Sequence, residues 1–133
     1  MDIDQAFEQL HEESGGFPAV YYSKPLLQII LEGKGEIKAA YQERTDDINQ
    51  FTIWCVTEKT VEKFGFNALN VEVTSRAIQE IKEIRKEYML STHDRQPEPK
   101  LKRIMLQFSD SFDAIDAPEG AKVIQRFNEL AIA

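Results

Sequence analysis

The sequence predicts a single α+β domain in which a mostly antiparallel sheet of about four to six strands packs against a long central helix. Two observations favour this class. Runs of β-branched and aromatic residues occur at 51–57 and 69–73, whereas apolar residues recur at helical spacing over about 75–90. The 133 residues lie within the usual size of one domain, so we expect one core for the whole of 1–133.

The first predicted element is a short N-terminal helix. Asp2 or Asp4 can cap it, apolar residues recur at helical spacing over 3–10, and a Gly-Gly pair ends it. The next segment, 17–22, is predicted to be extended. A proline disfavours a helical conformation in the residue before it, and aromatic residues suit a strand.

Residues 26–57 are predicted to form a meander of strands at 26–32, 36–42 and 51–57, separated by a Gly-Lys-Gly turn and a polar loop. The first two segments can equally be helical, because periodicity does not distinguish helix from strand in short apolar runs. The third has the clearest strand composition of the region.

The middle of the chain is predicted to contain a helix, a strand and a second helix. Residues 58–64 suggest a short helix, and 69–73 alternate between apolar and polar residues in the period of a half-buried strand. Thr74 or Ser75 can then cap the long helix over about 75–90, whose isoleucines lie on one stripe with charged residues on the opposite face.

The last part of the chain is predicted to be an exposed loop, a strand and a helix. Residues 91–100 contain two prolines and almost no apolar residue, which is typical of a surface loop. Asp116 and Glu119 form a capping-box pattern that opens a C-terminal helix over about 117–131. Three apolar residues of the strand between them are expected to share one face: Ile104, Leu106 and Phe108.

The formal net charge of −7 is concentrated at the two ends of the chain. Residues 1–33 carry six acidic residues against one lysine, whereas 67–103 carry eight basic residues against six acidic ones. An acidic chain of this kind favours a basic partner, and the same charge also serves solubility.

We expect a cytoplasmic protein that does not enter a membrane. The longest apolar run, 26–31, is far shorter than the roughly 20 residues that cross a bilayer. The acidic N-terminus lacks the basic and apolar regions of a secretory signal. The single cysteine, Cys55, cannot form an intrachain disulfide and is predicted to pack in the core, which suits a reducing compartment.

The sequence contains no motif that predicts a catalytic, cofactor or metal site. His11 and His93 lie far apart in sequence, and Cys55 has no partner at the spacing of a zinc site. The acidic residues between 110 and 119 suit turns and a helix cap better than a cation site. We therefore assign no catalytic residue, no cofactor and no metal ligand, although an enzyme whose site is assembled by the fold stays a third alternative.

Nucleic-acid binding is a weaker alternative. Four basic residues form a local stretch that could contact phosphates: Arg95, Lys100, Lys102 and Arg103. Acidic residues alternate with these bases, as on an ordinary solvated surface. We therefore expect no direct contact with nucleic acid.

The composition is most simply explained by a protein-binding protein, such as an inhibitor or an immunity protein that neutralises a basic partner, for example a nuclease toxin. Aromatic anchors and carboxylates that steer association would form its surface. The candidate residues are Tyr21, Tyr22, Asp46, Asp47, Asp110, Asp113 and Asp116. The main alternative is a structural or assembly subunit, of the phage or secretion-particle type, that associates with copies of itself into a homo-oligomer.

Overall fold

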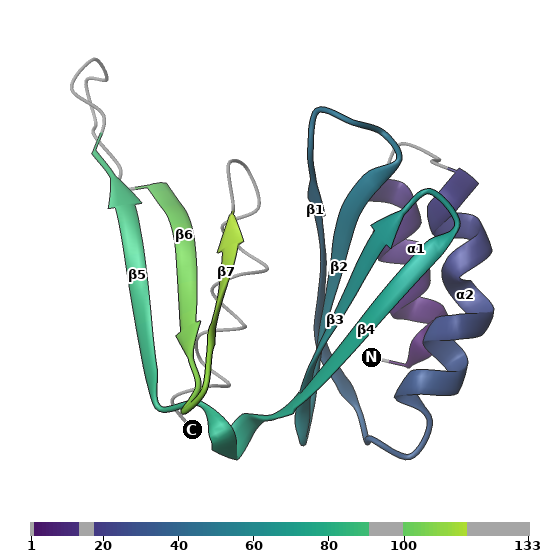
Figure 1. Ribbon diagram of the computed structural model, residues 1–133. Coiled ribbons are helices and arrows are strands. Elements are labelled where there is room, and N and C mark those ends of the chain that lie inside the picture. Colours follow the sequence, from purple (N-terminus) through teal and green to yellow (C-terminus); the bar gives the residue numbers. More distant parts are fainter. Residues whose placement is uncertain (1, 14–17, 91–99, 117–133) are drawn as a thin grey trace. The chain divides into compact units, whose positions relative to one another are not determined.

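The computed structural model describes residues 2–13, 18–90 and 100–116 (Figure 1). The chain divides into two compact units, Met1–Ile78 and Gln79–Ala133, which are described separately below. The expectation of one domain over 1–133 stays a prediction.

The first unit begins with helix α1, Ile3–Glu13, as the sequence predicts. Its N-terminus has a capping box in which Asp2 Oδ1 accepts a hydrogen bond from the Gln5 backbone N–H at 2.8 Å and Gln5 Oε1 accepts one from the Asp2 N–H at 3.0 Å. Ala6 and Leu10 are buried one turn apart, so the helix packs on the core through this face.

Helix α2 covers Pro18–Leu31, so the predicted extended segment at 17–22 and the predicted strand at 26–32 are wrong. Proline is favoured in the first turn of a helix. The backbone N–H groups of that turn have no acceptor within the helix, so proline loses no hydrogen bond there, and its fixed φ is already helical. For 26–32, the helical alternative is correct. Ser23, Leu27 and Leu31 are buried at intervals of four residues, which places them on one face.

Four strands follow, in the order β1-β2-β3-β4, each antiparallel to its neighbours: β1, Ile37–Arg44; β2, Gln50–Thr57; β3, Thr60–Asn67; and β4, Asn70–Ala77. The strands predicted at 36–42, 51–57 and 69–73 are confirmed. The short helix predicted at 58–64 is wrong. Its i, i+3 apolar pair, Val61 and Phe64, fits a strand in which Phe64 faces the core and Val61 the opposite face.

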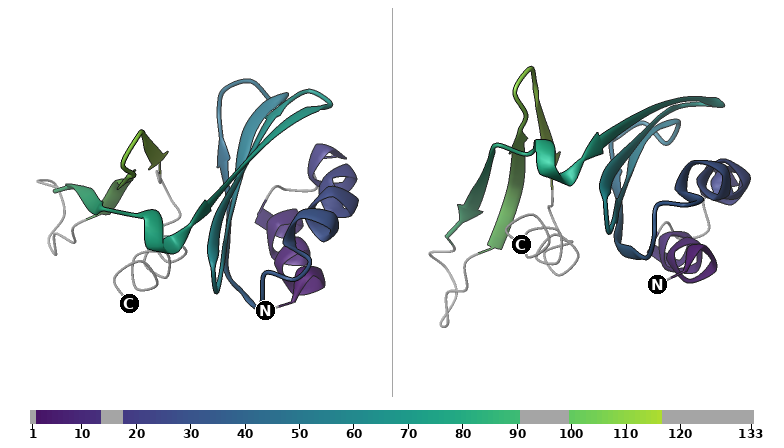
Figure 2. Two further views of the ribbon diagram at one scale, coloured as in Figure 1. Left: turned by 60° about the horizontal axis from the view of Figure 1, so that its bottom comes forward. Right: turned by 90° about the horizontal axis from the view of Figure 1, so that it is seen from below.

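The core of the first unit lies between the helices and one face of this sheet (Figure 2). The register places Phe51 beside Phe66 and Ile53 beside Phe64 across β2 and β3, and the two phenylalanine rings stack with centroids 4.4 Å apart. Cys55 continues the same row and is fully buried, which confirms its predicted place in the core. Burial of these side chains supplies the main stabilising free energy of the unit.

The long central helix predicted over 75–90 is absent from the structure. β4 runs to Ala77, a single 3-10 turn η1 covers Ile78–Glu80, and strand β5 covers Glu83–Met89. Of the isoleucines in the predicted helical stripe, Ile84 lies on β5, whereas Ile78 begins η1 and Ile81 lies between η1 and β5. A β-branched residue such as Ile84 also suits a strand once a pairing partner exists. The pairing of β4 with β3 in a hairpin and of β5 with β6 therefore decides the conformation.

The second unit contains an antiparallel sheet of order β5-β6-β7, in which β6 covers Lys100–Gln107 and β7 covers Phe112–Asp116. The strand prediction is confirmed, and Ile104, Leu106 and Phe108 are buried as expected. The predicted single sheet is thus replaced by separate sheets of four and three strands, and the described residues are mostly β. The loop predicted at 91–100 lies outside the described residues except for Lys100, which begins β6, and so does the helix predicted at 117–131.

One buried polar atom of the first unit lacks a partner. Gln42 lies on β1 beside Ile53, a core residue, and among the described residues no donor reaches its Oε1. A buried acceptor without a hydrogen bond costs free energy that an apolar group of the same shape does not.

We therefore predict that Gln42→Met raises the free energy of unfolding by about 1 kcal/mol. Urea unfolding followed by tryptophan fluorescence measures the change. The exposed Gln50, at the start of β2, provides the control, because Gln50→Met should change the stability by less than about 0.5 kcal/mol. A loss of stability in Gln42→Met would show that the amide is needed at this position.

Candidate functional site

The loop between β1 and β2 is fixed by its own hydrogen bonds. Thr45 Oγ1 lies 2.7 Å from the Gln50 carbonyl oxygen, and Asp47 Oδ1 accepts a hydrogen bond from the Asn49 N–H at 2.9 Å. The Gln50 N–H donates to the Asp47 carbonyl at 3.0 Å. This is the hydrogen bonding that makes Thr and Asp frequent in turns. The loop therefore presents the exposed Ile48, 66% accessible, in a defined position.

The turn between β3 and β4 lies beside this loop. The Ala68 N–H donates to the Asn49 carbonyl at 2.7 Å, which joins the two hairpins at one end of the sheet. Ala68 has a φ of 52°, in the left-handed region that non-glycine residues rarely adopt. The next residue, Leu69, is 87% accessible. We refer to Asp46, Asp47, Ile48 and Leu69 as the hairpin-end surface.

The two carboxylates of this surface differ in their ion pairing from some of the other carboxylates that the structure describes. No described side chain forms an ion pair with Asp46 or Asp47. Six other carboxylates have a cationic partner within 4.0 Å: Asp4, Glu36, Glu62, Glu83, Glu87 and Asp116. The hairpin end thus combines two exposed aliphatic side chains with negative charge that nothing in the described chain neutralises.

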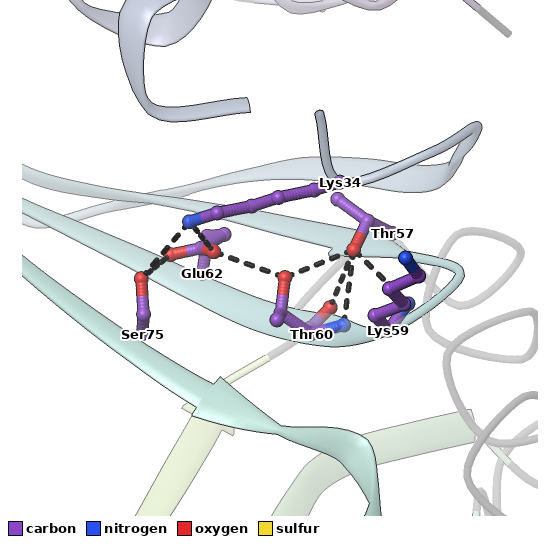
Figure 3. A network of polar contacts seen from close by, with 6 residues as sticks. All are labelled: Lys34, Thr57, Lys59, Thr60, Glu62 and Ser75. Carbon is purple, nitrogen blue, oxygen red and sulfur yellow. Dashed lines mark hydrogen bonds and ion pairs between the residues drawn. The ribbon is translucent and has the colours of Figure 1, made fainter. Parts of the chain in front are cut away.

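A second polar cluster surrounds Glu62, whose side chain is completely buried on the core face of β3 (Figure 3). Lys34, from the loop between α2 and β1, forms an ion pair with Glu62 Oε1, and the Ser75 hydroxyl donates to Oε2. The Thr60 hydroxyl donates to Oε1 at 2.9 Å. These contacts supply the partners that a buried carboxylate requires.

The hydroxyl groups of Thr57 and Thr60 extend this cluster into the turn between β2 and β3. Their oxygens lie 2.9 Å apart, and because Thr60 gives its proton to Glu62, the Thr57 hydroxyl must be the donor of the pair. Thr57 Oγ1 also accepts the backbone N–H groups of Lys59 at 3.2 Å and Thr60 at 3.0 Å. A chain of hydrogen bonds through the Thr57 and Thr60 hydroxyl groups therefore connects the turn to the buried Glu62 carboxylate.

The cluster contains a serine and a lysine, which in some hydrolases act as nucleophile and base. Lys34 Nζ lies 3.3 Å from Ser75 Oγ, but it is paired with Glu62. An ammonium group has no lone pair with which to take the serine proton. The arrangement thus ties the α2–β1 loop to β3 and β4, and it gives no support for Ser75 as a nucleophile.

The thiol of Cys55 lies opposite Glu62 in the β2–β3 register. Burial, with the nearby Glu62 charge as a smaller cause, raises the pKa of Cys55 to about 12. Because the thiolate is the reactive form, Cys55 is not an activated nucleophile at neutral pH.

Four carboxylates border a shallow groove of about 820 Å³ between the start of α1, the end of α2 and the start of β1: Asp2, Asp4, Glu32 and Glu36. Two of them are already paired, Asp4 with Lys24 at 3.0 Å and Glu36 with Lys38 at 2.9 Å. The described residues contain no cluster of side chains suited to hold a metal ion. The groove is consequently a weaker candidate than the hairpin-end surface.

The structure places the predicted site residues in three separate regions. Asp46 and Asp47 belong to the hairpin-end surface. Tyr21 and Tyr22 lie on α2 rather than on a strand, and only their backbone is described. The remaining acidic candidates lie in the second unit: Asp110 before β7, and Asp113 and Asp116 on it.

The basic candidates also lie in the second unit. A β-bulge on β6 places both Lys102 and Arg103 opposite Glu87, at 3.7 Å and 3.9 Å, and Arg103 Nε donates to Asp116 at 2.6 Å. Lys100 begins β6, and Arg95 lies outside the described residues. The acidic neighbours therefore neutralise much of the charge that suggested phosphate binding.

Sequence reasoning missed the Glu62 cluster and the two aliphatic residues of the hairpin end. Glu62 falls within the helix predicted over 58–64, which gives no indication of its burial. In a strand it has the same parity as Phe64 and Phe66, a pattern that marks a charged residue on a core face. The exposure of Leu69 was missed because its alternation with Val71 and Val73 predicts the buried face of a strand over 69–73, whereas β4 begins at Asn70.

No protein-family model matches the chain, and neither the comparison with curated proteins nor that with solved structures finds a match. Of the two helices that the structure describes, neither has the length and apolar character needed to cross a membrane.

We predict that Lys34→Met lowers the free energy of unfolding by about 2 kcal/mol, because it leaves the buried Glu62 carboxylate without its cation. In a Glu62→Gln background the same substitution should cost less than about 0.5 kcal/mol, which denaturant unfolding of the four variants measures. The exposed Lys59→Met serves as the control. If Lys34→Met lowers the free energy of unfolding equally in the wild type and in the Glu62→Gln background, the coupling between Lys34 and Glu62 is contradicted.

A further prediction concerns pH. The hydrogen bond with Lys38 is the largest cause that lowers the pKa of Glu36 from 4.5 to about 2; the N-terminal amino group and the charge of Lys38 lower it further. The contribution of Glu36 to stability should therefore be complete above pH 4.5 and disappear as the pH falls toward 2. Carboxyl-carbon NMR titration should show the low midpoint, and Lys38→Met should raise it toward 4.5. A midpoint that Lys38→Met leaves unchanged would refute this cause.

Proposed function

We propose that the protein is a small acidic cytoplasmic protein-binding protein that neutralises a basic partner, in the manner of an inhibitor or immunity protein against a basic enzyme such as a nuclease toxin. The hairpin-end surface is its proposed contact. The observation that carries the proposal is the placement of Asp46 and Asp47, which form no ion pair with the described side chains, beside the exposed Ile48 and Leu69.

The chemistry of this surface suits such a partner in two respects. Uncompensated negative charge accelerates association with a positively charged protein, by an amount that depends on salt. Exposed aliphatic side chains can enter apolar pockets of the partner and slow dissociation. A surface with both features fits a basic protein with an apolar site between its charged residues.

The rigidity of the hairpin end supports the same proposal. The loop hydrogen bonds of Thr45 and Asp47 and the contact between Ala68 and Asn49 hold both tips before any partner arrives. Binding then loses less conformational entropy than it would with a mobile loop. The strained backbone of Ala68 fits this interpretation, because such strain is often found at binding sites.

Affinity capture with the full chain tests the proposal. We expect immobilised wild-type protein to retain a basic protein from the lysate of its native cell, identified by mass spectrometry, with an association rate that falls as salt rises. The double variant Asp46→Asn with Asp47→Asn, and separately Leu69→Ser, should each reduce this retention by about tenfold or more.

The matched control is Glu8→Gln with Glu72→Gln, which removes the same charge from exposed positions outside the hairpin end. It should retain the partner as the wild type does. The proposed surface is contradicted if every variant retains the partner as well as the wild type does. It is also contradicted if the control loses the partner to the same extent as the hairpin-end variants. The absence of any specifically captured basic protein would contradict the proposed function itself.

A further inference from the structure

Strand β5 forms one edge of the three-stranded sheet in the second unit (Figure 1). An edge strand has a row of backbone N–H and C=O groups that no strand of its own sheet uses. The end of β5 is also unusually apolar for an exposed segment. Tyr88, Met89 and Leu90 are consecutive, and they are 51%, 56% and 73% accessible. Exposed apolar area beside a strand edge that no described strand occupies is typical of an interaction surface.

The sequence of β5 is complementary to itself when two copies run antiparallel. A twofold axis normal to the sheet at Lys86 places Arg85 of each copy opposite Glu87 of the other. The same register places Ile84 opposite Tyr88. Opposite charges and apolar pairs directly across two strands are the contacts that stabilise a sheet.

Neighbouring registers lack this complementarity. An axis at Arg85 places Glu83 opposite Glu87, and an axis at Glu87 places Lys86 opposite Tyr88 and Arg85 opposite Met89. The first opposes like charges, and the second contains no pair of opposite charges. Of these three axes, only the one at Lys86 combines charge and apolar complementarity, at the cost of one pair of like charges between the two Lys86 side chains.

The other edge of the same sheet does not fit a second copy. β7 carries Asp113 and Asp116 and no basic residue, so two copies placed edge to edge would gain no charge pair. Charged residues on β5 disfavour indiscriminate pairing with unrelated strands. Their order on β5, however, favours one particular partner strand.

We propose that two copies of the chain associate through β5, antiparallel and centred on Lys86, so that the three-stranded sheets of the two copies form one continuous sheet. This contact is separate from the hairpin-end surface and independent of the function proposed for it. The interface is short, so we expect a reversible dimer of moderate affinity rather than a permanent one.

Sedimentation velocity of the full chain over a range of concentrations tests the proposal. The wild type should shift from monomer to dimer as its concentration rises. Arg85→Glu should weaken the dimer by about tenfold or more, because it replaces two attractive pairs by two repulsive ones. Lys86→Thr should strengthen the dimer by about threefold, because it removes the like charges on the axis.

Two controls separate this register from a general effect of charge. Lys82→Glu makes the same change in charge as Arg85→Glu at an exposed position before β5, and it should leave the dimer unchanged. Lys86→Glu also leaves one pair of like charges on the axis, so it too should have little effect. Circular dichroism of each variant checks that the fold is retained.

A wild-type chain that stays monomeric up to millimolar concentration overturns the proposal. A dimer that Arg85→Glu leaves intact also overturns it, as does a dimer that Lys82→Glu weakens to the same extent. The gain in affinity expected for Lys86→Thr cannot arise from misfolding, so its absence in a dimer that otherwise responds as expected would rule out the axis at Lys86.

Discussion

The burial of Glu62 is the constraint on which the first unit depends most. A carboxylate on a core face must be given hydrogen bonds and a positive charge, or its desolvation would oppose folding. Lys34, Ser75 and Thr60 meet this need from the α2–β1 loop, β4 and β3 itself. The Glu62 side chain thereby connects the α2–β1 loop, β3 and β4.

The same constraint explains why the α2–β1 loop has its sequence. Lys34 lies between Gly33 and Gly35, whose φ angles of 77° and 85° are costly for any other residue. A Cβ atom at Gly35 would also collide with Glu58. The loop can thus turn sharply and place the Lys34 ammonium group beside the buried Glu62 carboxylate. The hairpin-end surface, Asp46, Asp47, Ile48 and Leu69, lies at the opposite end of the sheet.

The two surfaces that we connect with binding differ in physical character. The hairpin end is built from fixed loops with uncompensated charge, which suits a different, basic protein. The β5 edge has alternating charges and backbone groups that no strand of the described sheet uses on its outer side, which suits a copy of the same strand. Lys102 and Arg103, on the neighbouring strand β6, are engaged with Glu87 and Asp116. This pairing argues against the nucleic-acid alternative.

The sequence by itself determined the elements whose local pattern had one interpretation. These are the capped first helix, the strands at 51–57 and 69–73, the buried face of β6, and Cys55 in the core. Tertiary structure decided α2, β3 and the segment from 75 to 90, to which the sequence pattern assigned other conformations. There tertiary structure supplied the deciding free energy, through the packing of α2 on the core and the pairing of β3, β4 and β5 with neighbouring strands. It also decided the site, because the contacts of Glu62 with Lys34 and of Asn49 with Ala68 join residues that only long-range pairing brings together.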